Sequence, residues 1–326
     1  MSESTATIVS PRFRSAVSKA GVGLVLVLLV ALCTLTVPHF ASISNIRNIF
    51  TQITINTILA SGMTFVIVSG GIDLSVGAVM AISAVVCGKI VAGDVEDPSL
   101  FLGIAAGVAT GSVFGAFNSF VSERWRLPSF IVSLGTLNIA RGAALTIAEG
   151  RTIYNFPMAF VRFGSNSLFN VLPSIFLVAI AIVVVGQFLL SATVFGRLVL
   201  AIGTNESAVR ISGHPTWRYK MLAFVISGFC AGIAGVVYSA RLTVASPIMG
   251  VGFELNAIAA VIIGGASFEG GKGSLAGTLF GASIMGVLTN ALILLGVTDF
   301  TRQIVTGSVI ILAVVLDSYR KQLATD

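Results

Sequence analysis

The sequence predicts an all-α polytopic membrane protein, and three observations lead to this fold class. Apolar residues make up 56% of the chain and charged residues only 10%, whereas a soluble domain usually carries about a quarter charged residues. The mean hydropathy is +1.00. Apolar runs of membrane-spanning length recur along the chain, and its 35 glycines suit close helix packing in lipid. These runs leave no room for a sizeable soluble domain.

The apolar segments predict about ten membrane crossings, or eight to ten if short segments are discounted. They are residues 21–37, 56–68, 78–92, 100–121, 128–148, 173–190, 221–244, 255–263, 275–295 and 303–316. Residues 255–263 are too short to cross alone, and residues 40–49 are amphipathic and expected to lie along the membrane surface. Glycines at 103, 107, 111 and 115 form a small-residue ladder suited to helix packing. The predicted organisation is a tail (1–20), a membrane domain (21–318) and a second tail (319–326).

The net charge of +6 is better explained by orientation in the bilayer than by a nucleic-acid partner. Basic residues mark the segments that we assign to the cytoplasm, which are residues 1–20, 122–126, 191–219 and the chain end after residue 318. The acidic residues 93–99 and the long loop 149–172 are assigned to the outside. Both termini are therefore expected in the cytoplasm.

The segment of residues 69–77 (SGGIDLSVG) interrupts two apolar runs and contains Asp73. A carboxylate in hydrocarbon is costly, so it should face protein or water inside a bundle. Gly70 and Gly71 allow the backbone to leave helical geometry there. Two interpretations stay open: a broken helix beside a permeation path, or a short turn at the membrane surface. The later segment with Gly264, Gly265 and Ser274 repeats this pattern, and paired interruptions in two halves are typical of transport sites.

A path for a small polar solute needs modest hydrogen-bonding capacity, and polar or glycine positions near the interruptions could supply it. The candidate positions are Asn56, Gly70, Gly71, Asp73, Ser75, Asn138, Asn256, Gly264 and Gly265. For each polar residue the alternative is a helix–helix hydrogen bond or a turn cap. Asp73 in particular could accept from backbone amides at the start of the following helix.

Motifs for enzymatic chemistry are missing from the sequence. Residues 266–273 (ASFEGGKG) approach the phosphate-loop pattern, but they lack its first glycine and its final hydroxyl residue. His39 and His214 lie in separate loops, so we expect no metal site and no catalytic residues. The three cysteines lie in apolar runs and are interpreted as packing residues.

Three long motifs resemble the permease subunits of ribose-type ATP-binding cassette sugar importers, in the branched-chain amino acid/ribose permease superfamily. They are residues 196–213 (GRLVLAIGTNESAVRISG) with 219–241, residues 70–77 (GGIDLSVG), and residues 263–281 (IGGASFEGGKGSLAGTLFG). The resemblance covers roughly residues 46–316. It implies a fold similar to the cobalamin-importer type, with two pseudo-repeat halves, in the bacterial inner membrane.

The resemblance also implies partners. A second permease copy or a related permease, two cytoplasmic ATPase domains and a periplasmic or lipid-anchored sugar-binding protein would assemble with this chain in the lipid bilayer. ATP and Mg²⁺ would be bound by the ATPase subunits, with no cofactor in this chain. The alternatives are an ion-coupled secondary transporter that uses Asp73 and, less favoured, a channel or scaffold.

Within the cytoplasmic loop of residues 192–219, residues 201–212 can form a short amphipathic helix that ends at Gly213. Asn205 lies near its start and Glu206 in its first turn. Such a helix suits a groove in an ATPase and could transmit a rigid-body movement; the alternative is a solvated loop helix. The residues assigned to this coupling role are Ala201, Gly203, Asn205, Glu206, Ala208, Ser212 and Gly213.

Overall fold

The computed structural model describes residues 11–92, 99–168 and 171–325, and it is almost entirely helical. Its helices are α1 (Pro11–Thr36), α2 (Ile43–Val68), α3 (Val76–Val91), α4 (Leu100–Trp125), α5 (Ser129–Ile147), α6 (Met158–Ser165), α7 (Ser174–Ala192), α8 (Val194–Ile211), α9 (Thr216–Leu242), α10 (Phe253–Ile263), α11 (Leu275–Leu294) and α12 (Asp299–Thr325). A short antiparallel hairpin pairs β1 (Ser167–Leu168) with β2 (Leu172–Pro173).

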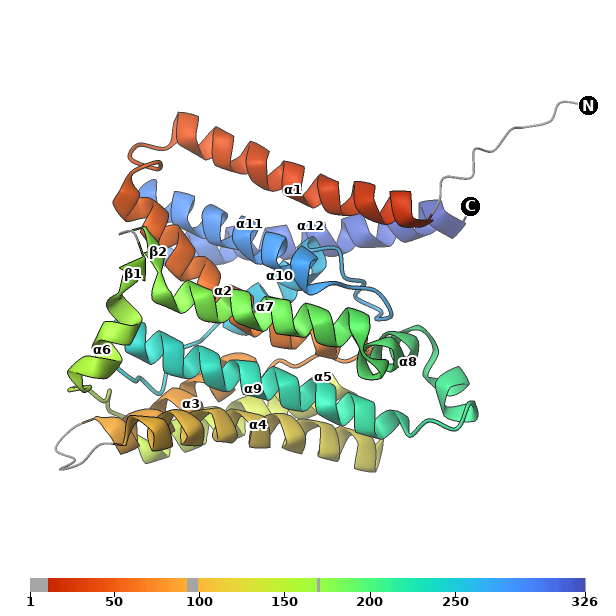
Figure 1. The fold of residues 1–326 in the computed structure, drawn as a ribbon, viewed down its shortest axis with the longest axis horizontal. Coiled ribbons are helices and arrows are strands. Elements are labelled where there is room, and N and C mark those ends of the chain that lie inside the picture. Colours follow the sequence, from red (N-terminus) through yellow and green to blue (C-terminus); the bar gives the residue numbers. More distant parts are fainter. Residues whose placement is uncertain (1–10, 93–98, 169–170, 326) are drawn as a thin grey trace, which may run out of the picture.

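The long helices lie side by side in one bundle (Figure 1). Helix α8 and the end of α12 lie at one end of the bundle, and α6 and the hairpin lie at the other (Figure 1). The loops predicted for opposite sides of the membrane therefore lie at opposite ends. The predicted external segment 93–99 falls, apart from Ser99, outside the described residues.

Each apolar segment predicted as a crossing is helical. Helices α2, α4, α5, α7, α9 and α11 are long and apolar enough to cross a membrane, and shorter apolar helices occupy Gly21–Thr36, Val76–Val91 and Phe253–Ile263. Helix α2 is buried almost throughout, whereas α4, α5 and α7 each expose one side. The centre of the bundle is therefore α2, with α9, α11 and α10 packed around it.

Residues 40–49 were expected to lie along the membrane surface, but from Ile43 onward they form the first turns of α2, which continues without a break to Val68. The Asn45 side chain donates to the carbonyl of Phe40 over 2.8 Å and exchanges hydrogen bonds of 2.9 Å with Asn290 on α11. These contacts hold the first turns of α2 against the bundle. The amphipathic pattern of residues 40–49 therefore reflects the start of α2 packed against α11.

Two other predicted boundaries also change. The loop 149–172 contains helix α6 and the start of the hairpin, and Phe160 of α6 is buried against the bundle. Helix α9 begins at Thr216 rather than at residue 221, so its first turns extend into the predicted cytoplasmic segment. Pro215 precedes this start, and a proline at that place cannot interrupt helical hydrogen bonds.

The predicted glycine ladder of α4 is confirmed as a close packing surface. Gly103, Gly107, Gly111 and Gly115 are all buried. A Cβ on Gly111 would overlap the carbonyl oxygen of Gly228 on α9, and a Cβ on Gly115 would overlap the carbonyl oxygen of Phe224. Backbones of α4 and α9 therefore touch directly, which only glycine permits.

Replacing Gly111 by alanine should destabilise the bundle, because the added methyl must push α4 away from α9. Overpacking of this kind costs about 1–3 kcal/mol. The measurement is the thermal unfolding midpoint in detergent, compared with Gly135→Ala on α5, where a Cβ would meet nothing within 4 Å. Equal midpoints for the two variants would show that the ladder is not a tight contact.

Candidate functional site

Helix α2 ends at the first predicted interruption. The amide of Gly70 donates to the carbonyl of Ile67 and the amide of Gly71 to the carbonyl of Val66, both over 2.9 Å. Gly70 has φ +83°, the left-handed conformation that favours glycine. This pair of hydrogen bonds is the Schellman motif, which satisfies the last carbonyls of a helix. The sequence Gly70-Gly71 is thus a helix stop.

Helix α10 ends in the same way at the second interruption. The amide of Gly265 donates to the carbonyl of Ile262 over 2.9 Å, and the amide of Ala266 donates to the carbonyl of Val261 over 3.2 Å. Gly265 has φ +89°. The repeated sequence pattern therefore corresponds to one local structure used twice, as the comparison of the two halves predicted.

The two interruptions differ where the chain returns to helix. Ser274 caps α11, since its hydroxyl accepts from the amide of Gly277 over 3.1 Å. Ser75 precedes α3, but its hydroxyl donates to the Asp73 carboxylate over 2.6 Å instead. Asp73 also accepts from the amide of Ser75 over 3.0 Å, so it stabilises the turn before α3 and does not reach amides within that helix.

Asp73 is the centre of a buried hydrogen-bonded cluster. In addition to Ser75, its carboxylate accepts from Asn118 Nδ2 on α4 over 3.2 Å and from Ser227 Oγ on α9, also over 3.2 Å. Asp73 itself is 1% exposed. A buried carboxylate needs such donors, and these ones tie the first interruption to two other helices.

Asn118 and Ser227 were missed in the sequence. The glycine ladders could have identified both residues, because Asn118 lies three residues after Gly115 and Ser227 directly precedes Gly228. A polar side chain within a stripe of small residues faces a neighbouring helix at close range. The stripe therefore predicts where a buried polar partner is available.

The two interruptions meet each other and helix α8. The amide of Gly271 donates to the carbonyl of Val68 over 2.9 Å. A Cβ on Gly203 of α8 would overlap both the Val68 carbonyl and the Gly271 amide. A Cβ on Gly270 would lie 3.0 Å from Gly203 Cα and 3.0 Å from Gly70 N. We call this contact of three backbone segments the glycine junction.

Helix α8 differs from the predicted coupling helix at its start. It begins at Val194 and not at Ala201, because the Thr193 hydroxyl caps it by accepting from the Gly196 amide over 3.2 Å. Gly203 consequently lies inside the first part of α8. The physical reason is that residues 194–204 contain no helix breaker other than glycine.

A kink divides α8 at Asn205, which has φ −158° and ψ 93°. The Asn205 side chain accepts from the Ala208 amide over 3.0 Å and caps the short second part, residues 206–211. Gly213 follows that part with φ +85°, and its amide donates to the Arg210 carbonyl over 3.0 Å. Asn205 and Gly213 therefore lie at its two ends, while Ala208 and Ser212 are exposed.

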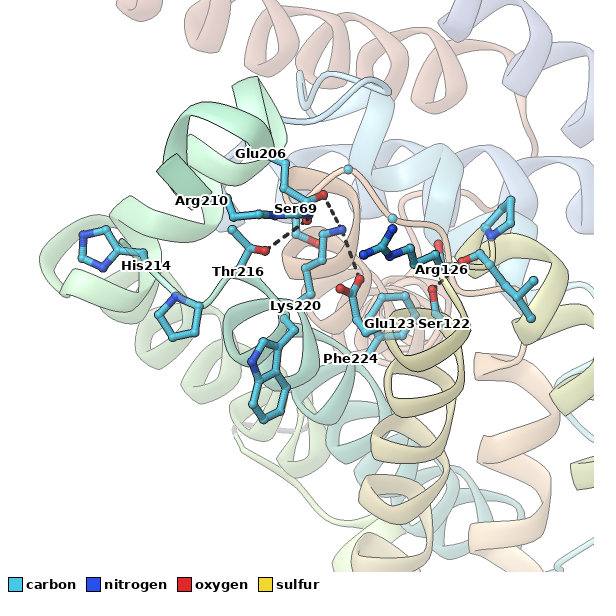
Figure 2. A pocket seen from close by; sticks show the side chains of 17 residues that line it. Ser69, Ser122, Glu123, Arg126, Glu206, Arg210, His214, Thr216, Lys220 and Phe224 are labelled. Atoms are coloured by element: carbon cyan, nitrogen blue, oxygen red, sulfur yellow. Dashed lines mark hydrogen bonds and ion pairs between the residues drawn. The ribbon is translucent and has the colours of Figure 1, made fainter. Parts of the chain in front are cut away.

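Glu206 connects this second part of α8 to the bundle (Figure 2). Its carboxylate pairs with Lys220 of α9 over 2.6 Å and with Arg210 over 2.8 Å, and it accepts from the Thr216 hydroxyl over 3.1 Å. Lys220 also pairs with Glu123 of α4 over 3.1 Å. One network of charges thus joins α8, α9 and α4.

The charge state of Glu206 follows from these contacts. Partial burial raises the pKa of a carboxylate, but the hydrogen bond and the charge of Lys220, with the hydrogen bonds of Arg210 and Thr216, outweigh it. The pKa of Glu206 is therefore held below its ordinary value. Glu206 is ionised at neutral pH, so the network persists under physiological conditions.

A hollow of about 620 Å³ lies at this end of the bundle, between the first interruption, the α4–α5 turn, the second part of α8 and the start of α9 (Figure 2). Its lining residues include Ser69, Gly70, Gly71, Glu123, Arg126, Glu206, Arg210, His214, Trp217 and Lys220. Charges of both signs surround it. Charged groups around an interface steer a partner toward it and fix its orientation, so this end of the bundle is a candidate docking surface.

The remaining predicted path residues do not come together in the described part of the chain. Asn56 is buried in α2, Asn138 is exposed on α5 and Asn256 is half-buried on α10. No hydrogen bond joins any of these three side chains to another within the described ranges. Gly264 lies against Gly277 of α11, where a Cβ would meet the Gly277 backbone at 2.5 Å. Their place along a permeation path stays a prediction.

The chain matches the family described as branched-chain amino acid transport system / permease component over residues 45–314. It is 41% identical over 309 residues to the ribose import permease protein of Bacillus subtilis, covering 94% of each chain. It is 38% identical over 301 residues to the D-allose transport system permease protein of Escherichia coli, covering 92% of this chain and 91% of the relative. The L-arabinose ABC transporter permease protein of Azospirillum brasilense is 35% identical over 305 residues, which cover 94% of this chain and 89% of the relative. No solved structure matches the chain.

Proposed function

Because the chain belongs to the family of branched-chain amino acid transport system permease components, we propose that it forms the membrane path for a monosaccharide in an ATP-binding cassette importer. The observation that carries this function is similarity at 35–41% identity, over nearly the whole chain, to permeases for ribose, allose and arabinose. The apolar helices agree with this role. The members of this family are permease components, so the chain itself is a non-catalytic transport subunit.

We propose further that the second part of α8 docks on a cytoplasmic ATPase subunit. Its exposed residues and the mixed-charge hollow behind it support this role. The Glu206 network makes the segment rigid relative to α9 and α4. A rigid segment moves as one body, so a displacement of the ATPase is passed on to the helices that the segment contacts.

The glycine junction connects α8, whose second part is proposed to dock on the ATPase, to the two interruptions at the end of α2 and before α11. Gly203 contacts the end of α2 and the loop before α11 with no side chain between them. A displacement of α8 must therefore move both interruptions together, because packed backbones do not compress. This arrangement supports a mechanism in which closure of the ATPase acts on both halves of the permease at once.

The assembly proposed from the family is a pair of permease subunits with two ATPase domains, which bind ATP and Mg²⁺, and an external sugar-binding protein. We also propose the cobalamin-importer type of fold, with the α8 end and both termini in the cytoplasm. An ion-coupled secondary transporter is not favoured. Asp73, the residue that such a mechanism would use, has its carboxylate occupied by donors from Ser75, Asn118 and Ser227.

Uptake in proteoliposomes tests this function. The permease is reconstituted with its ATPase subunits and binding protein, and entry of radiolabelled ribose, allose and arabinose is followed with and without ATP on the ATPase side. We expect import that requires both ATP and the binding protein and that survives an ionophore. Import driven by an ion gradient in vesicles without ATPase subunits would contradict the proposal.

A further inference from the structure

A second, smaller hollow of about 350 Å³ lies between α4 and α9 at the α8 end of the bundle. It is lined by Ser119, Phe120, Glu123, Arg124, Trp217 and Met221. We call it the α4/α9 groove. Its walls are mainly apolar, whereas the larger hollow beside it carries six charged or titratable side chains. It therefore suits a ligand with substantial apolar surface.

The groove opens onto an apolar stripe of α4. Val113, Phe117 and Phe120 are 65%, 44% and 57% exposed, and their spacing of four and three residues places them on one helix face. Arg124 follows Phe120 by four residues and continues the same face. The stripe thus runs along the membrane-spanning part of α4 and ends in a positive charge.

Two exposed arginines lie at the polar end of the groove: Arg124 lines it, and Arg218 follows the lining residue Trp217 in the chain. Arg124 lies over the ring of Trp125 at 5.9 Å, and Arg218 lies over the ring of Trp217 at 5.3 Å. Neither guanidinium has an acidic partner among the residues that the structure describes. The one carboxylate in the wall, Glu123, is already paired with Lys220. The unpaired charge at this end is therefore positive.

Tryptophan and arginine at the end of an apolar stripe match the level of lipid headgroups in a bilayer. A guanidinium binds phosphate oxygens through paired N–H donors, and basic pockets between membrane helices are suited to anionic headgroups. The acyl chains of the same molecule would lie along the stripe. The positive charge and the apolar surface of the groove together favour an amphiphilic ligand with an anionic headgroup.

We propose that the α4/α9 groove binds an anionic phospholipid of the leaflet at the α8 end. Its phosphate is held by Arg124 and Arg218, and one acyl chain lies against Phe117 and Phe120. The proposal does not depend on the course of the sugar path or on the proposed docking of an ATPase. It rests only on the position of the bundle in a bilayer.

The two tryptophans of the chain provide a local probe, because Trp217 lines the groove and Trp125 packs against the lining residues Phe120 and Arg124. The full-length protein is reconstituted in phosphatidylcholine vesicles that contain a small fraction of brominated phosphatidylglycerol or of brominated phosphatidylcholine. Bromine quenches tryptophan fluorescence on contact. We expect more quenching by brominated phosphatidylglycerol, because the groove would concentrate the anionic lipid beside the tryptophans. Non-selective boundary lipid contributes equally in both cases, so the excess reports binding in the groove.

The double variant R124Q/R218Q should remove this excess. One arginine near a membrane surface contributes about 1 kcal/mol toward an anionic lipid, which corresponds to roughly fivefold in affinity per residue. The control is Arg151→Gln, which removes one exposed positive charge from the loop that contains α6. Thermal unfolding of each variant verifies that the bundle remains folded.

Three outcomes would overturn the proposal. The first is equal quenching by the two brominated lipids in the native protein. The second is an unchanged excess in the double variant. The third is no quenching at all combined with a stable dimer that dissociates in the double variant, which would show that a second copy of the chain covers the groove.

Discussion

The variant Gly203→Val is expected to lower sugar uptake by roughly tenfold or more while the assembled transporter still hydrolyses ATP. The branched side chain would overlap the Val68 carbonyl and the Gly271 amide, so α8 and the two interruptions must separate. Overpacking costs about 1–3 kcal/mol, and each 1.36 kcal/mol changes an equilibrium about tenfold, so uptake should fall by roughly tenfold or more. Uptake and ATP hydrolysis are measured on the same proteoliposomes.

The matched control is Gly307→Val on α12, where a Cβ would meet nothing within 4 Å. It makes the same chemical change on another helix and should leave uptake near its native rate. If Gly203→Val also transports normally, the glycine junction does not transmit movement. Loss of the folded protein in Gly203→Val is detected by size-exclusion chromatography, and Gly203→Ala then offers the smaller perturbation.

The variant Ala208→Trp tests the docking of α8 on the ATPase separately from the transmission of movement through the glycine junction. Ala208 is exposed on the second part of α8, so the larger side chain does not disturb the permease itself. If that part enters a groove of the ATPase, the variant should lose ATPase subunits on co-purification, whereas Gly203→Val should retain them. Normal co-purification and uptake in Ala208→Trp would contradict the docking role.

Replacement of Asp73 by alanine is expected to lower the amount of folded protein sharply. The substitution leaves the buried amide and hydroxyl of Ser75 and the hydroxyl of Ser227 without an acceptor, while Asn118 Nδ2 keeps only its 2.9 Å hydrogen bond to the Ser75 hydroxyl. Each unsatisfied buried donor costs about 1–3 kcal/mol, and the sum approaches the 5–15 kcal/mol typical of a whole domain. Folded yield and the thermal midpoint in detergent measure the effect.

The variant Asp73→Asn is the matched control, because it removes the negative charge but keeps a side chain of the same shape. Its carbonyl oxygen can take the place of the Asp73 Oδ1 atom toward Ser75 and Asn118, and its amide can donate to the Ser227 hydroxyl. We expect Asp73→Asn to assemble and transport. If Asp73→Asn assembles normally but does not transport, the charge itself acts in transport; if Asp73→Ala folds normally, the cluster is not a structural centre.

Local sequence patterns predicted the helices and the sites where they stop, because these features depend on neighbouring residues. Long apolar runs need a membrane, glycine at every fourth position permits a close helix contact, and Gly-Gly after an apolar run ends a helix. The family resemblance was also present in the sequence itself. Boundaries were wrong where tertiary contacts extend a helix, as at Ile43, where Asn45 is held by Asn290.

Only the tertiary structure decided which segments touch. Asp73 was evident as a carboxylate in an apolar setting, but its partners Asn118 and Ser227 lie 45 and 154 residues away in the chain. Gly203 was assigned to a cytoplasmic helix, yet its contact with Val68 and Gly271 determines what that helix can move. Such contacts arise from the packing of whole helices, which no local pattern encodes. The sequence thus determined the elements and the family, and the packing decided how the cytoplasmic helix reaches both interruptions.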